Sequence, residues 1–153
     1  MTVEREYTEG RTTILTADVE HYSGDKKQIT ASLPVFYNPR MRLNRDISVL
    51  FLSAYLQDTK IESICEPLTG SGIRALRYLN ECPGDFKAKL FDANPNAVDT
   101  ASRNIEKLGL QERAQVLKGD AKFLLMTESR EKRFDYVDVD PFGTPAPYLN
   151  ASI

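Results

Sequence analysis

The sequence predicts an α/β fold built on a parallel sheet. From residue 60 onward, short apolar runs alternate with longer segments whose apolar residues recur at helical spacing. Each of the short runs is followed within a few residues by an acidic residue, at the strand end where ligands bind in such sheets. This alternation implies parallel strands with helices on both faces, which is a Rossmann-like arrangement.

The first part of the chain has a different character. Residues 1–33 are polar and contain β-branched runs such as residues 12–15, with a turn signal at residues 23–25. They predict a small β-rich N-terminal extension. A loop follows at residues 36–39, and residues 47–56 are apolar on most sides, which predicts a buried helix.

The remaining elements follow in alternating order. Helix signals are clearest around residues 96–108, where Asn94 can act as the N-cap, Pro95 lies in the first turn and Gly109 follows the end. The sheet should contain about four parallel strands whose carboxyl ends line one crevice. The predicted strands are residues 61–65, 88–91, 114–117 and 136–139, and the other predicted helices are residues 73–80 and 121–127.

Composition limits the classes of function. The 153 residues carry 20 basic and 22 acidic side chains, a net charge of −2, so an RNA-binding surface would have to be a local patch. Cys65 and Cys82 are too few for a disulfide framework or a zinc site, and they predict reduced thiols in a cytoplasmic protein. The N-terminus is charged and no apolar run is long enough for a membrane span.

Glycines follow the first predicted strand, at positions 70 and 72. They let the backbone turn tightly into a helix and let a ligand lie against it. With Ala75 they match the dinucleotide-binding pattern Gly-x-Gly-x-x-Ala, although an ordinary strand-to-helix turn also explains a lone match. Asp92 follows Gly72 by about 20 residues, the spacing of an acid that binds ribose hydroxyls. The two features together predict a nucleoside site.

The third predicted strand is followed by Gly119, Asp120 and Ala121. The Asp120 carboxylate can accept a hydrogen bond from an adenine amine, and the Ala121 amide can donate one to a ring nitrogen. Alternatively, Asp120 only caps the helix at residues 121–127. The residues by themselves leave both interpretations open.

The fourth predicted strand ends in the run Asp140-Pro141-Phe142-Gly143. Asp140 can accept one N–H of an amine and the Pro141 carbonyl the other, which turns the nitrogen lone pair toward an electrophile. Phe142 can stack on a planar base, and Gly143 permits a sharp exit. An ordinary turn explains Asp-Pro alone, but the complete run after an apolar strand favours methyl transfer to the amino nitrogen of a base.

These motifs together resemble the S-adenosylmethionine-dependent class I amino-methyltransferases. Three strings narrow the resemblance to the tRNA (guanine-26, N2)-dimethyltransferase family of archaea and eukaryotes. They occur in the family's order and cover the chain from about residue 34 to its end: Phe36-Tyr37-Asn38-Pro39 with Asn44-Arg45-Asp46, then residues 68–74, then residues 138–143.

The resemblance implies transfer of methyl groups from S-adenosylmethionine to the exocyclic N2 of guanine 26 in tRNA, giving N2,N2-dimethylguanosine. It implies that Arg45 pairs with the methionine carboxylate of the cofactor, a charge-assisted contact. The same resemblance gives roles to the other motif residues: Glu66 and the backbone of Gly70 to Gly72 at the methionine part, Asp92 at the ribose, Asp120 and Ala121 at the adenine, Asp140 in catalysis with Pro141, and Phe142 stacked on the target guanine with Phe36 on its other face. No metal is implied.

The sequence departs from the family in two ways. Leu68 stands where many class I methyltransferases have the first glycine of the loop, and the family's enzymes are much longer. We therefore expect an N-terminal fragment with incomplete activity. Residues 1–45 would form the N-terminal extension and the cofactor and substrate loop, and residues 46–153 a cofactor-binding domain truncated after the fourth strand.

Two alternatives remain at this stage. An NAD-dependent oxidoreductase would use the same glycines and Asp92, but it leaves the run after the fourth strand unexplained. A non-catalytic fragment that binds a partner is the other alternative. An uncovered sheet edge predicts self-association or a requirement for the remaining C-terminal half of the enzyme.

Overall fold

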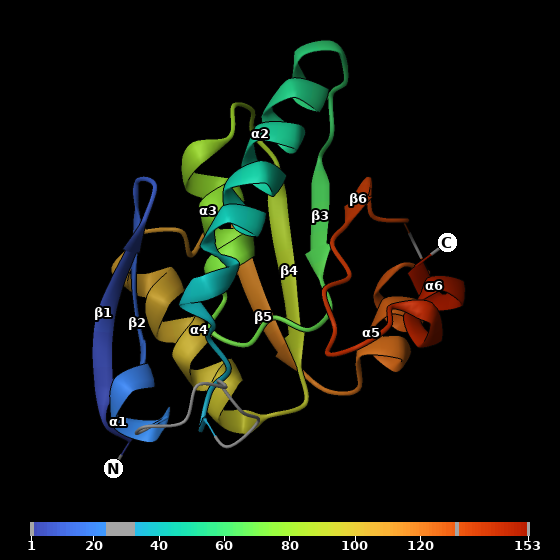
Figure 1. The fold of residues 1–153 in the computed structure, drawn as a ribbon. Coiled ribbons are helices and arrows are strands. Elements are labelled where there is room, and N and C mark those ends of the chain that lie inside the picture. The colour runs from blue at the N-terminus through green and yellow to red at the C-terminus, as the bar shows by residue number, and fades with distance from the viewer. Residues whose placement is uncertain (1, 24–32, 131, 153) are drawn as a thin grey trace.

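Four parallel strands form the sheet in the order β5-β4-β3-β6 (Figure 1), which confirms the predicted fold class. The computed structural model describes residues 2–23, 33–130 and 132–152. The strands are β3 (Ser63–Glu66), β4 (Lys87–Asp92), β5 (Ala114–Lys118) and β6 (Tyr136–Val137). The chain fills the sheet outward from β3 to β5 and then returns to the other side of β3. Ligands bind at such a reversal, beyond the carboxyl ends of β3 and β6.

The central strands are apolar because both faces of the sheet are covered. Ile64 and Cys65 of β3 and Leu90 and Phe91 of β4 are all buried. In the parallel register Ile64 lies opposite Ala88 on one side and opposite Tyr136 on the other. The register therefore brings the end of β3 level with the end of β6.

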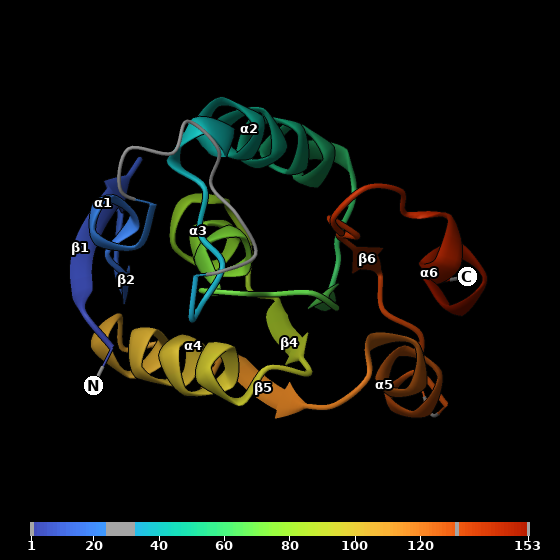
Figure 2. The ribbon, with the colours of Figure 1, turned by 60° about the horizontal axis from the view of Figure 1, so that its bottom comes forward.

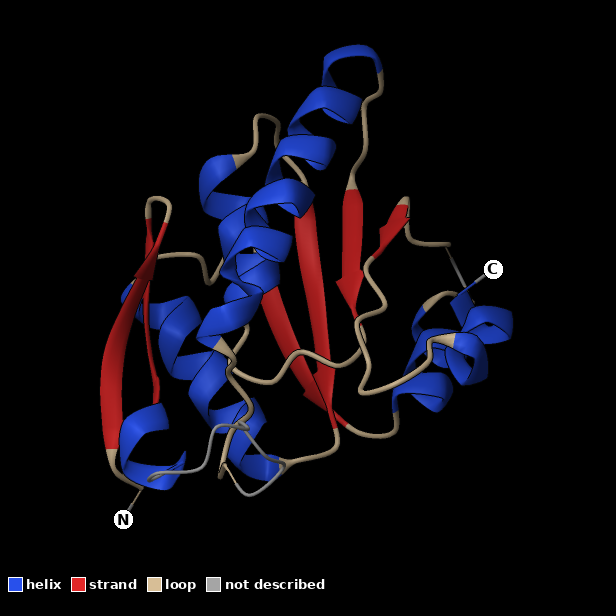
Figure 3. Cartoon of the chain, in the orientation of Figure 1, coloured by secondary structure: helices blue, strands red, loops and turns tan. Residues whose placement is uncertain are grey.

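Helices cover the two faces unequally, as Figures 2 and 3 show. One face carries α2 (Arg42–Asp58), α3 (Ile73–Glu81) and α4 (Pro95–Lys107), and the other carries α5 (Ala121–Glu128) and α6 (Ala146–Ser152). The larger core lies beneath the first group and includes Tyr78 and Phe86, while Phe91 and Leu125 anchor a smaller core on the other face.

Helix α4 begins and ends as its sequence predicts. The Asn94 side chain accepts a hydrogen bond of 3.0 Å from the backbone N–H of Asn96, and Pro95 occupies the first turn. Gly109 follows the end with a φ of +68°, the left-handed conformation that glycine adopts most readily.

A hairpin of β1 (Glu4–Glu9) and β2 (Thr12–Ala17) forms the β-rich start of the chain, followed by α1 (Val19–Ser23). The hairpin lies outside the helices, where β2 contacts α3 and α4 (Figures 1 and 2). The Asn104 side chain joins the two layers, because its amide accepts from Leu15 N at 2.8 Å and donates to Leu15 O at 2.9 Å. The predicted turn at residues 23–25 falls largely outside the described residues.

The prediction of a buried helix at residues 47–56 is wrong in two respects. The helix, α2, starts at Arg42 after a short 3-10 turn at Pro39–Met41. It is also largely exposed, with Ile47 58% and Leu50 70% accessible. Leu52 is its fully buried apolar residue, and Val49 and Leu56 are partly buried against the core. An all-round apolar pattern predicts burial only if a layer covers each side, and α2 lies at the outer edge of the molecule, packed against α3 (Figure 2).

Strand β6 ends at Val137, two residues earlier than expected. Beyond it, Asp138 and Asp140 turn toward side chains of α3. The predicted division between residues 45 and 46 falls inside α2 and remains a prediction. Within the described parts of the chain, every helix is too short or too polar to cross a bilayer.

Gly72, the second glycine of the loop, provides a test of packing at the start of α3. Its φ is +82°, and a Cβ there would lie 3.3 Å from the Cβ of Ala101 and from Cδ1 of Leu76. Gly109 has a similar φ of +68°, but in the described part of the chain nothing lies within 4 Å of an added Cβ. We expect Gly72→Ala to lower the free energy of unfolding by about 2–4 kcal/mol, since it adds crowding to backbone strain.

The matched variant Gly109→Ala adds only backbone strain, so it should lower the free energy of unfolding by about 1–2 kcal/mol. Urea unfolding of both variants and of the native chain measures the two costs. Equal losses would contradict the packing role that the structure gives to Gly72.

Candidate active site

A cavity of about 340 Å³ lies at the carboxyl ends of β3, β4 and β6. Its walls come from the glycine loop after β3, from the ends of β4 and β6, and from residues 33–41 ahead of α2. Eight of the predicted site residues line it: Phe36, Arg45, Glu66, Gly70, Asp92, Asp140, Pro141 and Phe142. The structure therefore brings together residues from four separate segments of the chain.

Position 70 requires a glycine because the backbone of another segment of the chain lies very close to it. Its φ is +52°, and a Cβ at this position would lie 2.8 Å from the carbonyl oxygen of Phe36. Any side chain would force the loop away from the segment at residues 33–41. Gly70 therefore allows the glycine loop and the segment at residues 33–41 to pack against each other, and this requirement does not depend on a ligand.

Asp92 also organises this loop. Its Oδ2 accepts a hydrogen bond of 2.8 Å from the backbone N–H of Gly70, and its Oδ1 accepts one of 2.9 Å from that of Asn94. Each carboxylate oxygen keeps a second acceptor site, so the fixed carboxylate can still accept hydrogen bonds from hydroxyl groups of a ligand. The ribose contact itself remains a prediction.

Glu66 is a buried carboxyl group in the cavity wall. Its Oε2 accepts hydrogen bonds from Thr69 Oγ1 at 2.8 Å and from the Ala75 amide at 3.1 Å. Burial, together with the nearby charge of Asp138, raises the pKa of Glu66 to about 8, although the Thr69 hydrogen bond works in the opposite direction. The group therefore holds its proton at neutral pH.

Arg45 lines the cavity from the first turns of α2 while its guanidinium is held from behind. Nε and Nη2 donate to the two carboxylate oxygens of Glu9 at 2.8 and 2.6 Å. Nη2 also donates to the carbonyl oxygen of Asn38 at 2.9 Å. The predicted contact of Arg45 with a ligand carboxylate stays a prediction, and it would have to use the remaining nitrogen, Nη1.

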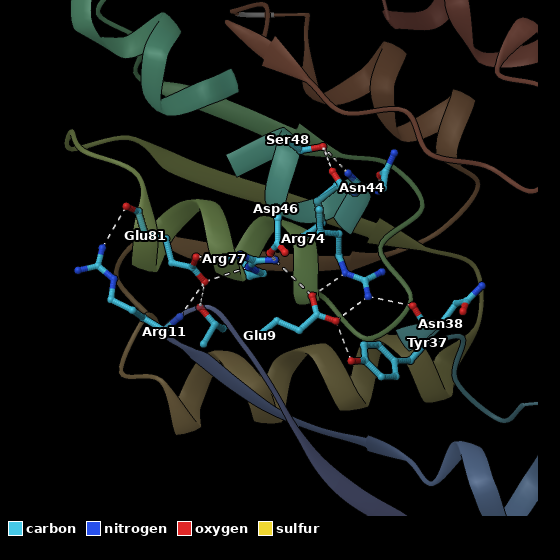
Figure 4. A network of polar contacts seen from close by, with 12 residues as sticks. Glu9, Arg11, Tyr37, Asn38, Asn44, Asp46, Ser48, Arg74, Arg77 and Glu81 are labelled. Atoms are coloured by element: carbon cyan, nitrogen blue, oxygen red, sulfur yellow. Dashed lines mark hydrogen bonds and ion pairs between the residues drawn. The ribbon is translucent and has the colours of Figure 1, made fainter. Parts of the chain in front are cut away.

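Arg74, which the sequence reasoning did not assign to the site, holds the catalytic candidate in place. Its Nη2 lies 2.5 Å from Oδ2 of Asp140 and also donates to Asn44 Oδ1 at 2.8 Å. Its Nη1 donates to Ser48 Oγ at 2.8 Å, as Figure 4 shows for the two partners on α2. Both elements flanking the cavity, α2 and the loop after β6, are thus tied to α3.

Asp138 completes this cluster behind the cavity wall. It accepts a hydrogen bond from Tyr78 Oη, and its Oδ2 lies 3.7 Å from Arg74 Nε. Burial raises the pKa of Asp138, while Arg74 and Tyr78 act against the rise and Asp140 adds to it. The cluster fixes the loop that carries Asp140 to the helix that follows the glycine loop.

The predicted pair of stacking rings is in direct contact. The centroids of Phe36 and Phe142 lie 4.4 Å apart at an interplanar angle of 72°. A base between them would require the rings to separate. Phe142 is 69% exposed and precedes Gly143, where an added Cβ would have no described neighbour within 4 Å, so Phe142 is the ring with room to move.

Three of the predicted residues do not line the cavity. Gly72 packs inside the core, as described above. Asp120 accepts a hydrogen bond of 2.9 Å from the backbone N–H of Phe123 and so caps α5, with Ala121 buried in the first turn. The capping interpretation of Asp120 is confirmed, and a contact of Asp120 and Ala121 with adenine remains a prediction.

Arg74 could have been found from one signal in the sequence. Arg74 and Arg77 are three residues apart on a helix that is otherwise apolar or buried along most of its length. Guanidinium groups in such a helix need acidic partners. That signal predicts nearby carboxylates without identifying Glu9, Asp138 or Asp140 as the ones that supply them.

The chain is similar in sequence to known proteins. Residues 10–153 match the model of the family described as N2,N2-dimethylguanosine tRNA methyltransferase. A tRNA (guanine(26)-N(2))-dimethyltransferase of Sulfurisphaera tokodaii is 40% identical over 97% of this chain and 37% of its own length. The corresponding enzyme of Methanosphaera stadtmanae is 41% identical over 84% of this chain and 32% of its own length. The chain spans about a third of the length of these curated relatives.

Solved structures give the same result. The chain resembles Trm1 from Pyrococcus horikoshii in its complex with S-adenosyl-L-methionine, with a TM-score of 0.76, 28% identity and coverage of 97% of this chain and 38% of that one. It shares its fold with a tRNA m1G37 methyltransferase of M. jannaschii at a TM-score of 0.66 and 11% identity, with coverage of 99% of this chain and 39% of that one.

The raised pKa of Glu66 makes the stability of the chain depend on pH. Because the folded-state pKa of about 8 lies above the ordinary value of 4.5, the folded state holds the proton more tightly, and stability falls as pH rises through that window. Glu66→Gln removes this loss. We expect the variant to gain stability relative to the native chain between these pH values, with a steepest slope of about 1.4 kcal/mol per pH unit.

Urea unfolding at a series of pH values measures this difference. Glu62→Gln is the control, because Lys132 lowers the pKa of the exposed Glu62 below its ordinary value of 4.5. The advantage of the native chain over that variant should therefore be lost only as pH falls below about 4.5, and the difference should stay constant across the window in which Glu66 titrates. A constant difference between Glu66→Gln and the native chain would show that Glu66 is ionised throughout.

Proposed function

Because the chain belongs to the N2,N2-dimethylguanosine tRNA methyltransferase family, we propose that it carries the catalytic site for methylation of N2 of guanine 26 in tRNA. The proposed methyl donor is S-adenosylmethionine. The chain spans about a third of its curated relatives, so the complete reaction, its tRNA substrate and a cytoplasmic location are part of the proposal.

One observation supports this function above others. The acceptor run Asp140-Pro141-Phe142 lines the same cavity as Glu66, Gly70 and Asp92. The residues that suit an amino group on a flat base thus face the residues that suit a nucleoside cofactor. An oxidoreductase would have no use for the acceptor side.

The residues in the cavity fit S-adenosylmethionine, which when bound supplies an electrophilic methyl group on a sulfonium. Asp92 is fixed by two backbone N–H groups and retains acceptor sites for ribose hydroxyls. Arg45 offers a guanidinium to the carboxylate of the methionine part. Ser71 adds a buried hydroxyl that has no hydrogen-bond partner within the described residues and that also lies in the cavity lining.

Asp140 is the proposed catalytic residue. Arg74 engages its Oδ2, which leaves Oδ1 to accept an N–H of the guanine amine. The Pro141 carbonyl accepts the second N–H, and both contacts favour a pyramidal nitrogen with its lone pair directed into the cavity. The carboxylate stabilises positive charge that develops on the nitrogen and can then receive the proton, so the site contributes positioning and electrostatics.

Recognition of the base is proposed to depend on Phe142. A guanine stacked within folded tRNA has to leave the stack to reach the cavity, and an aromatic side chain can replace the lost stacking. Phe142 is exposed beside Asp140, which suits this role. Arg40 and Arg42 are exposed next to the cavity wall and are proposed to contact backbone phosphates near the base.

Cofactor binding can be tested on the 153-residue chain itself. Isothermal titration with S-adenosylhomocysteine, the product form of the donor, should show one binding site, and titration with NAD under the same conditions should show none. Binding of NAD in preference to S-adenosylhomocysteine would replace the proposal with an oxidoreductase. Gel filtration of the same sample tests the predicted self-association.

The catalytic role of Asp140 requires an enzyme of the relatives' full length that contains this chain. Asp140→Asn keeps the size of the side chain but removes the charge and one acceptor, and we expect methyl transfer to tRNA to fall by a factor of about 10²–10³. Affinity for S-adenosylhomocysteine should change less than about twofold, because Asp140 is on the acceptor side of the cavity. Retained methyl transfer in the variant would rule out the assignment.

A further inference from the structure

Glu9 is a buried carboxylate at the end of β1, outside the proposed active site. Its side chain is 2% exposed, although it belongs to a hairpin that is otherwise rich in polar surface residues. A buried charge of this kind persists only with good partners. Glu9 accepts hydrogen bonds from Arg45 Nε and Nη2 and from Tyr37 Oη at 2.7 Å, and Arg77 Nη1 lies 3.4 Å away.

Glu9 remains ionised in this environment. Burial acts to raise its pKa, but the hydrogen bonds from Arg45 and Tyr37 and the charges of Arg45 and Arg77 outweigh it, so the pKa lies below the ordinary value. Its pairing with Arg45 is therefore a full carboxylate–guanidinium pair, with two parallel N–H···O bonds that fix the plane of the guanidinium.

Arg77 does not depend on Glu9 to the same extent. Its Nε and Nη2 donate to Glu81 at 3.0 Å each, and its Nη1 donates to Asp46 at 2.6 Å, as seen in Figure 4. These shorter contacts satisfy the Arg77 guanidinium from its own helix and from α2. Among the described residues Arg45 has no such second carboxylate, and Glu9 is therefore its main partner.

The pairing leaves one nitrogen of Arg45 for a ligand. Nε and Nη2 are occupied by Glu9 and by the carbonyl of Asn38. No described residue accepts a hydrogen bond from Nη1, and Arg45 lines the cavity. A guanidinium held along one edge in this way presents a fixed donor to the cavity, with its orientation settled before a ligand arrives.

We propose that Glu9 is a positioning residue, which holds the Arg45 guanidinium so that Nη1 binds the carboxylate of an amino-acid group in the cavity. The inference rests on the proposed function, since it specifies how the methionine part of the cofactor is recognised. It also gives the N-terminal hairpin a function in ligand binding. The hairpin reaches the cavity through Glu9 without contributing a lining residue of its own.

The proposal predicts a loss of affinity that depends on the ligand. Without Glu9, the Arg45 side chain samples several rotamers. A ligand that requires one particular rotamer then binds more weakly, in proportion to the population of that rotamer. For Glu9→Gln we expect affinity for S-adenosylhomocysteine to fall by about tenfold, which corresponds to a competent population of about one tenth. Affinity for 5′-methylthioadenosine, which has the same nucleoside but no carboxylate, should change less than about twofold.

The experiment is isothermal titration of the 153-residue chain with the two ligands. Glu4→Gln is the matched control, since it breaks another carboxylate–guanidinium pair of the same strand, to Arg103 at 2.6 Å, and neither of these residues lines the cavity. It should leave both affinities unchanged. Equal losses for the two ligands in Glu9→Gln would show a merely structural role, and unchanged or higher affinity for S-adenosylhomocysteine would also overturn the proposal.

A double variant keeps the test decisive if Glu9→Gln folds poorly. Arg45→Met lowers affinity for S-adenosylhomocysteine directly, and Glu9→Gln together with Arg45→Met removes both charges of the pair, which buried sites tolerate better than a single unpaired charge. If Glu9 acts through Arg45, the double variant should bind this ligand as Arg45→Met does. A further loss of more than about threefold would contradict the proposal.

The same titrations separate the failure of this inference from the failure of the proposed function. If the native chain binds neither ligand, the proposed function fails as well. If the native chain binds both but the variants do not discriminate between them, only the role of Glu9 is overturned.

Discussion

The structure depends on the pairing of three buried guanidinium groups. Arg45, Arg74 and Arg77 are each at most 4% exposed, and an unpaired charge in such a position would cost several kcal/mol. Glu81 lies one turn from Arg77 on α3, but the other carboxylate partners come from distant parts of the chain: Glu9 from the hairpin, Asp46 from α2, and Asp138 and Asp140 from beyond β6. The fold must therefore bring these segments together before the charges are satisfied.

The same pairs couple the fold to the proposed chemistry. Arg74 holds Asp140, and Glu9 holds Arg45, and both Asp140 and Arg45 line the cavity. Strand β6 has only two residues, so hydrogen bonds of the sheet alone would position the acceptor loop weakly. The ion pair to α3 supplies the missing constraint, and it places the acceptor carboxylate at a defined distance from the nucleoside side.

Local sequence signals predicted those features that local physics determines. The strand–helix alternation, the Asn94 cap and the glycine after α4 all depend on residues within a few positions of one another, and the structure confirms them. Burial of α2 was predicted wrongly because it depends on which elements lie next to the helix. The partners of Arg45 and Arg74 were not predictable for the same reason, since 36 and 66 residues separate Glu9 from Arg45 and Arg74 from Asp140.

The acceptor loop combines a fixed charge with a ring that has room to move. Asp140 is held by Arg74 at one oxygen, and a carboxylate fixed before the reaction stabilises developing charge without reorganising. Phe142, two residues later, is exposed and rests on Phe36, so its displacement by a base replaces one aromatic contact with another. Entry of the proposed base would therefore require movement of the ring beyond Pro141, while the group proposed to act on the amine would stay in place. Pro141 lies between Asp140 and Phe142 and restricts the backbone there, so the ring can move while the carboxylate stays fixed.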